Sequence, residues 1–120
     1  MQKLFFSLIF TLVTLVSFGQ DVANFGTSTT VNQGKQTGKF EVKLPARVTP
    51  EDVANYSQYY TNFFTVSFNN TTKIASIQMV NNDSQTRRII LRFLSSNQIS
   101  LVSVDNTPYD LNTFYDNFLK

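Results

Sequence analysis

Residues 39–44 read Lys39-Phe40-Glu41-Val42-Lys43-Leu44, so apolar and charged side chains alternate without a break. A period of two is the pattern of a half-buried β-strand, with one face on a core and the other in water. Pro45 ends this strand because proline has no N–H to give to a sheet. A strand over 39–44 therefore opens the predicted folded domain.

A helix start follows this strand. Thr49 has the side chain of an N-cap, and Pro50 stands at the first helical position, where its missing N–H costs nothing. Glu51 and Asp52 then place two carboxylates at the positive end of the helix dipole. The residues that continue an apolar stripe at helical spacing are Val53, Tyr56, Tyr60 and Phe63. The sequence predicts a helix from Pro50 to about residue 62.

Four short apolar runs come next, and the segments between them are rich in Asn, Ser and Thr. We predict strands at residues 63–68, 73–80, 87–94 and 98–104. Short polar separators favour hairpins between consecutive strands. The four runs therefore predict an antiparallel meander.

The end of the chain has the pattern of a second helix. Thr107 and Pro108 repeat the N-cap and first-position signals. The apolar stripe that follows consists of Leu111, Phe114, Tyr115, Phe118 and Leu119. We therefore predict one small α+β domain over residues 39–120, in the order β-α-β-β-β-β-α, with the sheet packed on the first helix and the amphipathic C-terminal helix docked on it.

This order of one strand, one helix and a meander, from about Gly38 to Val104, resembles the cystatin-like architecture. In that architecture a sheet wraps one long helix. The resemblance is one of topology only, because the Gln-x-Val-x-Gly hairpin of the inhibitors is missing. Residues 65–70, in the corresponding first hairpin, read Thr-Val-Ser-Phe-Asn-Asn. The resemblance implies a fold and carries no function.

The first 19 residues have the composition of a secretory signal peptide. Lys3 precedes an apolar run from Leu4 to Val16, and Ser17 and Gly19 are small residues at the positions that signal peptidase accepts. The run is shorter than the roughly 20 residues that span a bilayer. We therefore predict cleavage after Gly19, export to the periplasm or the medium, and no stable membrane span in the mature chain.

Residues 20–38 are poor in large apolar side chains and rich in Gly, Ser, Thr, Asn and Gln. This composition is typical of exposed connecting segments. We predict a flexible N-terminal arm here, with at most a weak strand near Thr27 to Val31.

The composition removes whole classes of chemistry. The chain of 120 residues contains no His and no Cys, which are the commonest general base, thiol nucleophile and transition-metal ligands. Of ten basic side chains against eight acidic ones, only Lys3 lies in the signal, so the mature charge is close to +1. That balance gives no basic face for nucleic acid. We expect no enzyme activity, no metal and no cofactor.

Most carboxylates have structural explanations. Asp105 fits a turn, Asp110 fits a capping box with Thr107, and Asp116 lies on the solvent side of the last helix. The alternative, a carboxylate-dependent hydrolase, would need Glu41 and Asp105 to face each other across a cleft.

Four side chains form the candidate binding surface. Arg88 and Arg92 share the outer face of the predicted strand over 87–94, with Lys73 across the sheet, and such a group can grip phosphate or sulfate. Tyr59 lies off the stripe of the first helix and suits recognition.

These observations favour an exported, non-enzymatic module that binds a protein or an envelope polymer. The alternative is a small carrier of an apolar ligand, with a pocket between sheet and helices. The aromatic side chains that would line this pocket are Phe40, Phe68, Phe93 and Phe114.

Overall fold

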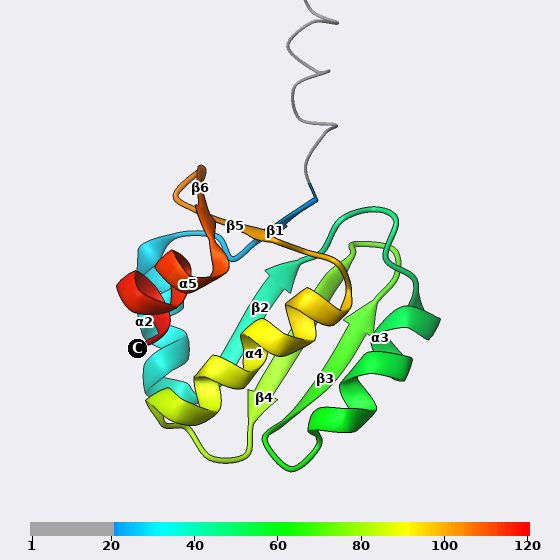
Figure 1. Cartoon of the computed structure of the whole chain (residues 1–120), viewed down its shortest axis with the longest axis horizontal. Coiled ribbons are helices and arrows are strands. Elements are labelled where there is room, and N and C mark those ends of the chain that lie inside the picture. The colour runs from blue at the N-terminus through cyan, green and yellow to red at the C-terminus, as the bar shows by residue number, and fades with distance from the viewer. Residues whose placement is uncertain (1–20) are drawn as a thin grey trace, which may run out of the picture.

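A six-stranded mixed sheet organises the protein in a computed structural model that describes residues 21–120 (Figure 1). The predicted signal peptide lies outside the described residues. The strands are β1(Val22–Asn24), β2(Lys39–Lys43), β3(Phe64–Asn69), β4(Ile74–Met79), β5(Leu101–Val104) and β6(Thr107–Asp110). The helical elements are α2(Ser28–Thr37), α3(Pro50–Ser57), the 3-10 turn η1(Gln58–Tyr60), α4(Ser84–Ser96), α5(Leu111–Phe114) and the π-helical turn η2(Tyr115–Leu119). The predicted α+β class is confirmed.

The strand order is β3-β4-β2-β1-β5-β6, which differs from the predicted meander. β2 pairs with β4 and β1, and β1 runs parallel to β5, so the sheet is mixed rather than antiparallel. The elements β2-α3-β3-β4-α4-β5 follow the order of a split βαβ unit. In this chain β1 is inserted between β2 and β5.

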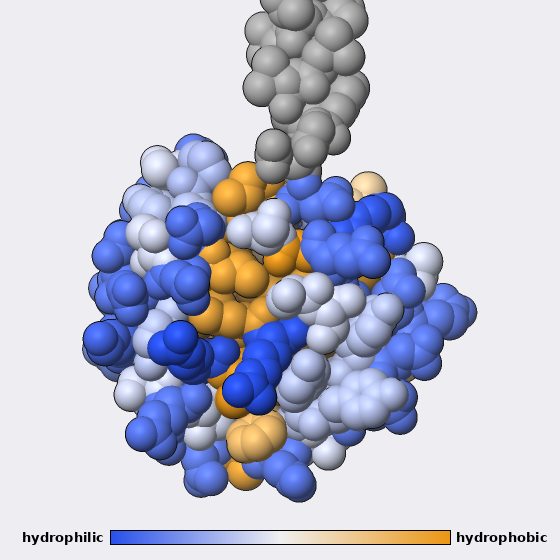
Figure 2. All heavy atoms as spheres, in the orientation of Figure 1, coloured by the Kyte–Doolittle hydropathy of each residue, from blue (hydrophilic) through white to orange (hydrophobic). Residues whose placement is uncertain are grey.

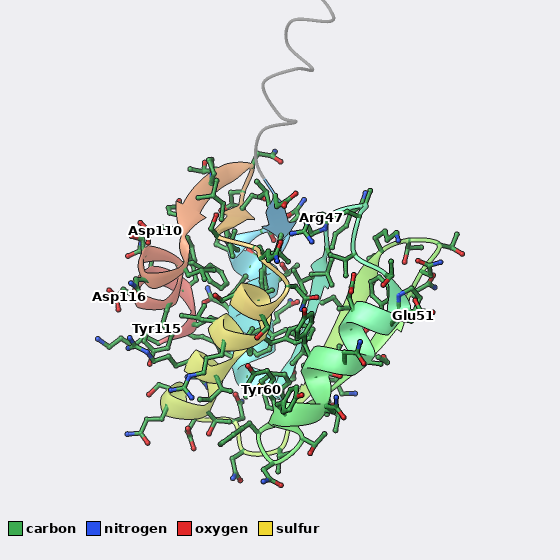
Figure 3. All side chains as sticks on the ribbon, turned by 45° about the vertical axis from the view of Figure 1, so that its right-hand side comes forward. Arg47, Glu51, Tyr60, Asp110, Tyr115 and Asp116 are labelled. Carbon is green, nitrogen blue, oxygen red and sulfur yellow. The ribbon has the colours of Figure 1, made fainter. Side chains whose placement is uncertain are left out.

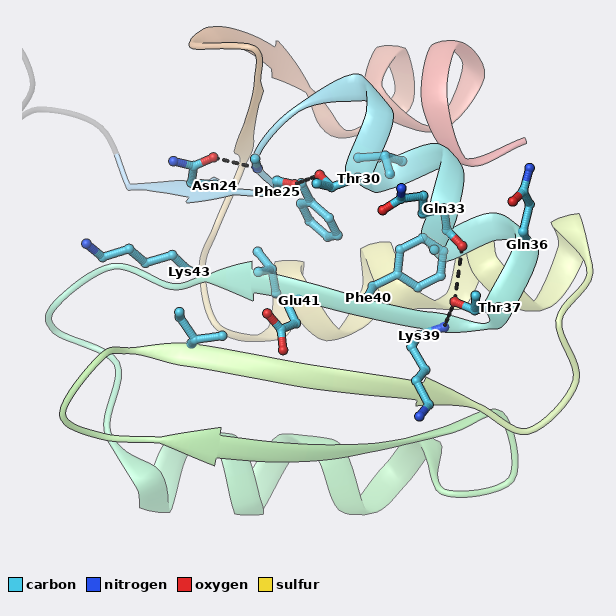
Figure 4. A pocket seen from close by; sticks show the side chains of 15 residues that line it. Asn24, Phe25, Thr30, Gln33, Gln36, Thr37, Lys39, Phe40, Glu41 and Lys43 are labelled. Carbon is cyan, nitrogen blue, oxygen red and sulfur yellow. Dashed lines mark hydrogen bonds between the residues drawn. The ribbon is translucent and has the colours of Figure 1, made fainter.

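The alternation in β2 has the predicted consequence. Phe40 and Val42 are buried, whereas Lys39, Glu41 and Lys43 are exposed. The buried face of the sheet lies under α3 and α4, which are both on one side (Figure 1). The opposite face of β2, β4 and β3 is turned toward the viewer in Figure 4. Its exposed side chains include Lys39, Glu41, Thr65, Ser67 and Gln78.

The predicted start of the first helix is confirmed. The Thr49 hydroxyl accepts a hydrogen bond from the Asp52 N–H, the Asp52 carboxylate accepts one from the Thr49 N–H, and Pro50 is the first helical residue. Helix α3 ends at Ser57, earlier than predicted, and continues as η1.

The predicted strand at residues 87–94 is wrong, because this segment belongs to helix α4. Asp83 caps the helix, since its carboxylate accepts a hydrogen bond from the Thr86 N–H at 2.8 Å. The buried residues of α4 are Arg87, Ile90, Leu91, Phe93 and Leu94. Positions 87, 90, 91 and 94 have the i, i+3, i+4, i+7 spacing of a helix, and this pattern overrides the alternation that predicted a strand.

The predicted arm at residues 20–38 is also corrected, because from residue 22 onward it contains β1 and helix α2. Thr27 and Thr30 form a capping box, and Gly38 ends the helix in the left-handed conformation, with φ 79°. The helix needs few apolar residues because only Val31 and Gly34 are buried. The ends of α2 are therefore marked in the sequence by its capping residues more than by an apolar stripe.

The C-terminal stripe is confirmed as helical, with Phe114, Tyr115 and Leu119 buried. Its start is not at Thr107, since Thr107–Asp110 is the edge strand β6. Asp110 is instead the N-cap of α5, and its carboxylate accepts a hydrogen bond from the Thr113 N–H.

Arg87 holds the C-terminal helix to α4. Its Nε donates to the Leu119 carbonyl at 2.7 Å, and one Nη donates to the backbone oxygen of Lys120 at 3.2 Å. The other Nη donates to the Asn82 side chain at 2.8 Å. This side chain is buried and tied at three points, so its role is structural.

Arg47 makes a second tie, from the loop after β2 toward β1 (Figure 3). Its guanidinium pairs with Asp21 at 2.8 Å and donates to the Asn97 carbonyl at the end of α4 at 2.7 Å.

On the side of the molecule that carries α4, apolar surface appears as a band beside this helix, within a mostly polar surface (Figure 2).

Candidate functional site

The candidate site arises where β1 leaves β2. The two strands pair only at Asn24↔Lys43. The chain then turns at Gly26, whose φ is 84° and whose N–H bonds to the Asn24 side chain at 2.7 Å. Helix α2 follows and returns along the edge of β2 (Figure 4). On the N-terminal side of Lys43, beside residues 39–42, helix α2 therefore takes the place that a neighbouring strand would have.

A groove of about 780 Å³ lies between α2 and this edge of β2 (Figure 4). The rings of Phe25 and Phe40 lie between the two elements and form part of an apolar floor. The other lining side chains are mostly neutral and polar or charged: Asn24, Thr30, Gln33, Gln36, Thr37, Lys39, Glu41 and Lys43. The groove thus offers amide and hydroxyl groups above an apolar floor.

The hydrogen-bond register of β2 determines which backbone groups face this groove. Met79 N–H donates to the Gly38 carbonyl, and Leu44 N–H donates to the Lys73 carbonyl. Because hydrogen-bonded pairs alternate along an antiparallel ladder, the even-numbered residues of β2 bond to β4 and the odd-numbered ones point away from it. The N–H and C=O groups of Glu41 therefore point toward the groove.

The residues two positions before and after Glu41 in β2 already make main-chain contacts outside β4. Lys43 pairs with Asn24, and the Lys39 N–H donates to the Thr37 hydroxyl at 3.2 Å. Glu41 has no such partner in β1 or β4. One residue of β2 thus presents a free main-chain donor and acceptor to the groove, as an open sheet edge does.

Gly34 closes one end of the groove. A Cβ at this position would lie 2.5 Å from the Phe40 ring and 2.8 Å from the Lys39 carbonyl oxygen. Only glycine permits this close approach of α2 to β2. The pairing of Asn24 with Lys43 closes the other end, so the opening is centred on Glu41.

The charges along the open face of β2 are not neutralised locally. Among residues 21–120, Arg47 and Asp21 form the one ion pair within 4 Å. The ammonium groups of Lys39 and Lys43 therefore lie farther than that from any described carboxylate, including that of Glu41.

The predicted binding surface is not brought together. Arg88 and Arg92 lie one turn apart on the exposed side of α4, and the Arg88 guanidinium lies 5.0 Å from the centroid of the Tyr115 ring. Lys73 is in the β3–β4 turn, where its ammonium donates to the Val48 carbonyl and the Asn70 side chain, each at 2.8 Å. Tyr59, in η1, is 72% exposed. Lys73 is not across a sheet from the arginines, since α4 is not a strand.

The carboxylates outside the groove serve as caps or lie apart. Backbone and hydroxyl hydrogen bonds from Thr86 lower the pKa of Asp83, and those from Thr113 lower the pKa of Asp110. Asp105 accepts a hydrogen bond from the Ser28 N–H at the start of α2. Figure 3 shows Glu51 on the opposite side of the molecule from Asp110 and Asp116. Within residues 21–120, no group of three or more acidic side chains is placed to hold a metal ion.

The four phenylalanines of the predicted apolar pocket belong to the core. Phe93 packs edge-on against Phe64, with ring centroids 6.1 Å apart, and Phe114 lies 4.7 Å from Phe25. Phe40 is buried, and Phe68 is half-buried at the margin of the core. Of these four residues, only Phe40 lines the groove between α2 and β2.

Sequence reasoning missed the groove because its helix was predicted to be a flexible arm. The signals that would have placed α2 are Thr27 and Gly38, which flank ten residues without proline.

A comparison of the chain with family models, curated proteins and solved structures finds no match. In the described part of the chain, no helix has the length and apolar character that crossing a membrane requires.

Proposed function

We propose that this protein is an exported, non-enzymatic binding module, and that the groove between α2 and β2 takes a short segment of a partner protein. The observation that carries the proposal is the main chain of Glu41, whose N–H and C=O groups face the groove without a partner from either neighbouring strand. A peptide backbone supplies the complementary acceptor and donor.

The side chains around the groove suit this kind of ligand. Asn24, Gln33 and Gln36 carry amides that can donate to and accept from a second main chain. The apolar floor, with Phe25 and Phe40, can receive one apolar side chain. A volume of about 780 Å³ is within the range of natural ligand sites.

Export is part of the proposal and rests on the sequence of residues 1–19. The mature protein is expected to begin at Gln20. Intact mass spectrometry of the exported protein tests this, and a mass that retains residues 1–19 would contradict it.

A display selection tests the binding function without a known partner. A library of random seven-residue peptides is selected against the wild-type protein, and the enriched peptides are then measured against two variants. Gln33→Trp places an indole in the groove. Asn32→Trp places the same ring on the neighbouring exposed residue, which does not line the groove.

We expect enriched peptides that bind the wild type and Asn32→Trp equally and lose at least tenfold in affinity for Gln33→Trp. If the peptides bind all three proteins equally, the binding site is not the groove. If no peptide is enriched while purified envelope polysaccharide binds in a Gln33-dependent way, the groove takes a polymer and not a protein segment.

A further inference from the structure

We infer that the segment bound in the groove is acidic on both sides of the residue that pairs with Glu41. This inference rests on the proposed function and deepens it by specifying the chemistry of the partner. It starts from the charges that β2 carries beside the open main-chain pair.

Lys39, Glu41 and Lys43 lie on one face of the strand, since side chains of alternate residues share a face. The two lysines are four residues apart, which is about 13 Å in a strand. Figure 4 shows their side chains leaving β2 at its two ends, with Glu41 between them. No described carboxylate neutralises either ammonium within 4 Å.

The shape of the groove limits how a segment can pair there. Gly34 packs on Phe40 at one end, and Asn24 pairs with Lys43 at the other. A long strand therefore cannot run along the edge of β2. An occupant can bridge to Glu41 through the main chain of one residue, and its flanks must leave across the open face of the sheet, where the two lysines are.

Opposite charges on facing side chains stabilise a strand pair, and like charges destabilise it. Where these flanks cross the open face, acidic residues two positions before and two positions after the bridging residue would lie near Lys39 and Lys43. The bridging residue itself should be neutral or basic on the open face because it faces the Glu41 carboxylate.

The same charges disfavour a second copy of this protein as the occupant. In a second copy the bridging residue would be Glu41 itself, so Glu41 would meet Glu41 and the lysines of one copy would lie near those of the other. Every facing pair then has like charges, so a partner of different sequence is favoured over self-association.

The test uses the exported full-length mature protein and capped seven-residue peptides. The first peptide has a central valine with glutamate two residues before and two residues after it. In the second peptide lysine replaces both glutamates. Binding is followed by backbone and side-chain amide shifts at low salt and again at 0.5 M salt, where exposed charge pairs are largely screened.

We expect the glutamate peptide to bind with shifts at Glu41 and at the Gln33 side chain, and the lysine peptide to bind at least fivefold more weakly at low salt. Lys43→Glu should weaken the glutamate peptide and strengthen the lysine peptide. Arg92→Glu makes the same change of net charge on α4, away from the groove, and should have little effect.

Three outcomes would overturn the inference. If both peptides bind at Glu41 with equal affinity, the charge rule fails and the proposed function stands. If neither peptide shifts Glu41 and the display selection also yields no groove-dependent peptide, both fail. If the protein alone forms a dimer that Gln33→Trp disrupts, the occupant is a second copy.

Discussion

The ring of Phe40 lies directly against the backbone of Gly34, so closely that a Cβ on residue 34 would come within 2.5 Å of a ring carbon. This contact joins α2 to β2 and sets the width of the groove at one end.

Gly34→Ala should destabilise the protein by about 1–2 kcal/mol, although alanine favours a helix by roughly 1 kcal/mol over glycine. The added methyl group also meets the Lys39 carbonyl at 2.8 Å, so α2 must move away from β2. Urea unfolding measures the change. Phe40→Leu in the same background should recover part of the loss, and a neutral or stabilising effect of the single substitution would show that the contact is absent.

Arg87→Met should destabilise the protein by about 3 kcal/mol, because it removes three hydrogen bonds that a buried guanidinium donates and leaves two backbone oxygens without this donor. Arg92→Met is the matched control on the exposed side of the same helix, and it should change the free energy of unfolding by less than about 0.5 kcal/mol. Equal effects at the two positions would mean that Arg87 does not hold the C-terminal helix.

Asp83→Ala should lower the melting temperature at neutral pH and make it depend less on pH in the acid range. The N–H and hydroxyl of Thr86 lower the native pKa of Asp83 below 3.8, so the charged carboxylate stabilises the fold above that pH. This contribution is lost as the pH falls through the lowered native value. Melting temperatures between pH 2 and pH 7 should therefore converge for wild type and variant at the acid end.

Asp116→Ala serves as the control for this pH series, since Asp116 is exposed and caps no helix. Its melting curve should follow that of the wild type over the whole range. A constant difference between Asp83→Ala and the wild type down to pH 2 would remove the charge-based explanation of the cap.

Patterns with a single interpretation predicted the elements they belong to. The alternation around Phe40 and Val42 gave β2, and Thr49 followed by Pro50 gave the start of α3. Both signals are local, since alternation marks a half-buried strand and capping groups satisfy specific backbone donors.

Helix α4 was missed because its sequence fits two periods. Ile89, Leu91 and Phe93 alternate as in a strand, whereas Ile90 and Leu94 complete a helical stripe. The buried Arg87 hid this stripe further, since a charged residue reads as a solvent position. Its burial depends on carbonyls contributed by the end of the chain, which no local pattern contains.

The candidate site was missed for a different reason. The sequence points to the carboxylate of Glu41, whereas the groove uses its main chain. That main chain is open because β1 diverges from β2 after Asn24 and Gly26 turns the chain into α2. The point at which β1 leaves β2 depends on pairing between segments far apart in the chain. The alternating pattern of a single strand cannot predict it.

Amide hydrogen exchange at Glu41 shows whether this residue offers a free main-chain donor and acceptor to a partner. Val42 is the internal reference, since it pairs with Ala75 in β4. In the free protein the Glu41 amide should exchange on the order of a hundredfold faster than that of Val42, and it should become protected when the glutamate peptide binds. If the Glu41 amide in the free protein exchanges as slowly as that of Val42, the edge of β2 is already covered and Glu41 cannot be the residue that pairs with a partner.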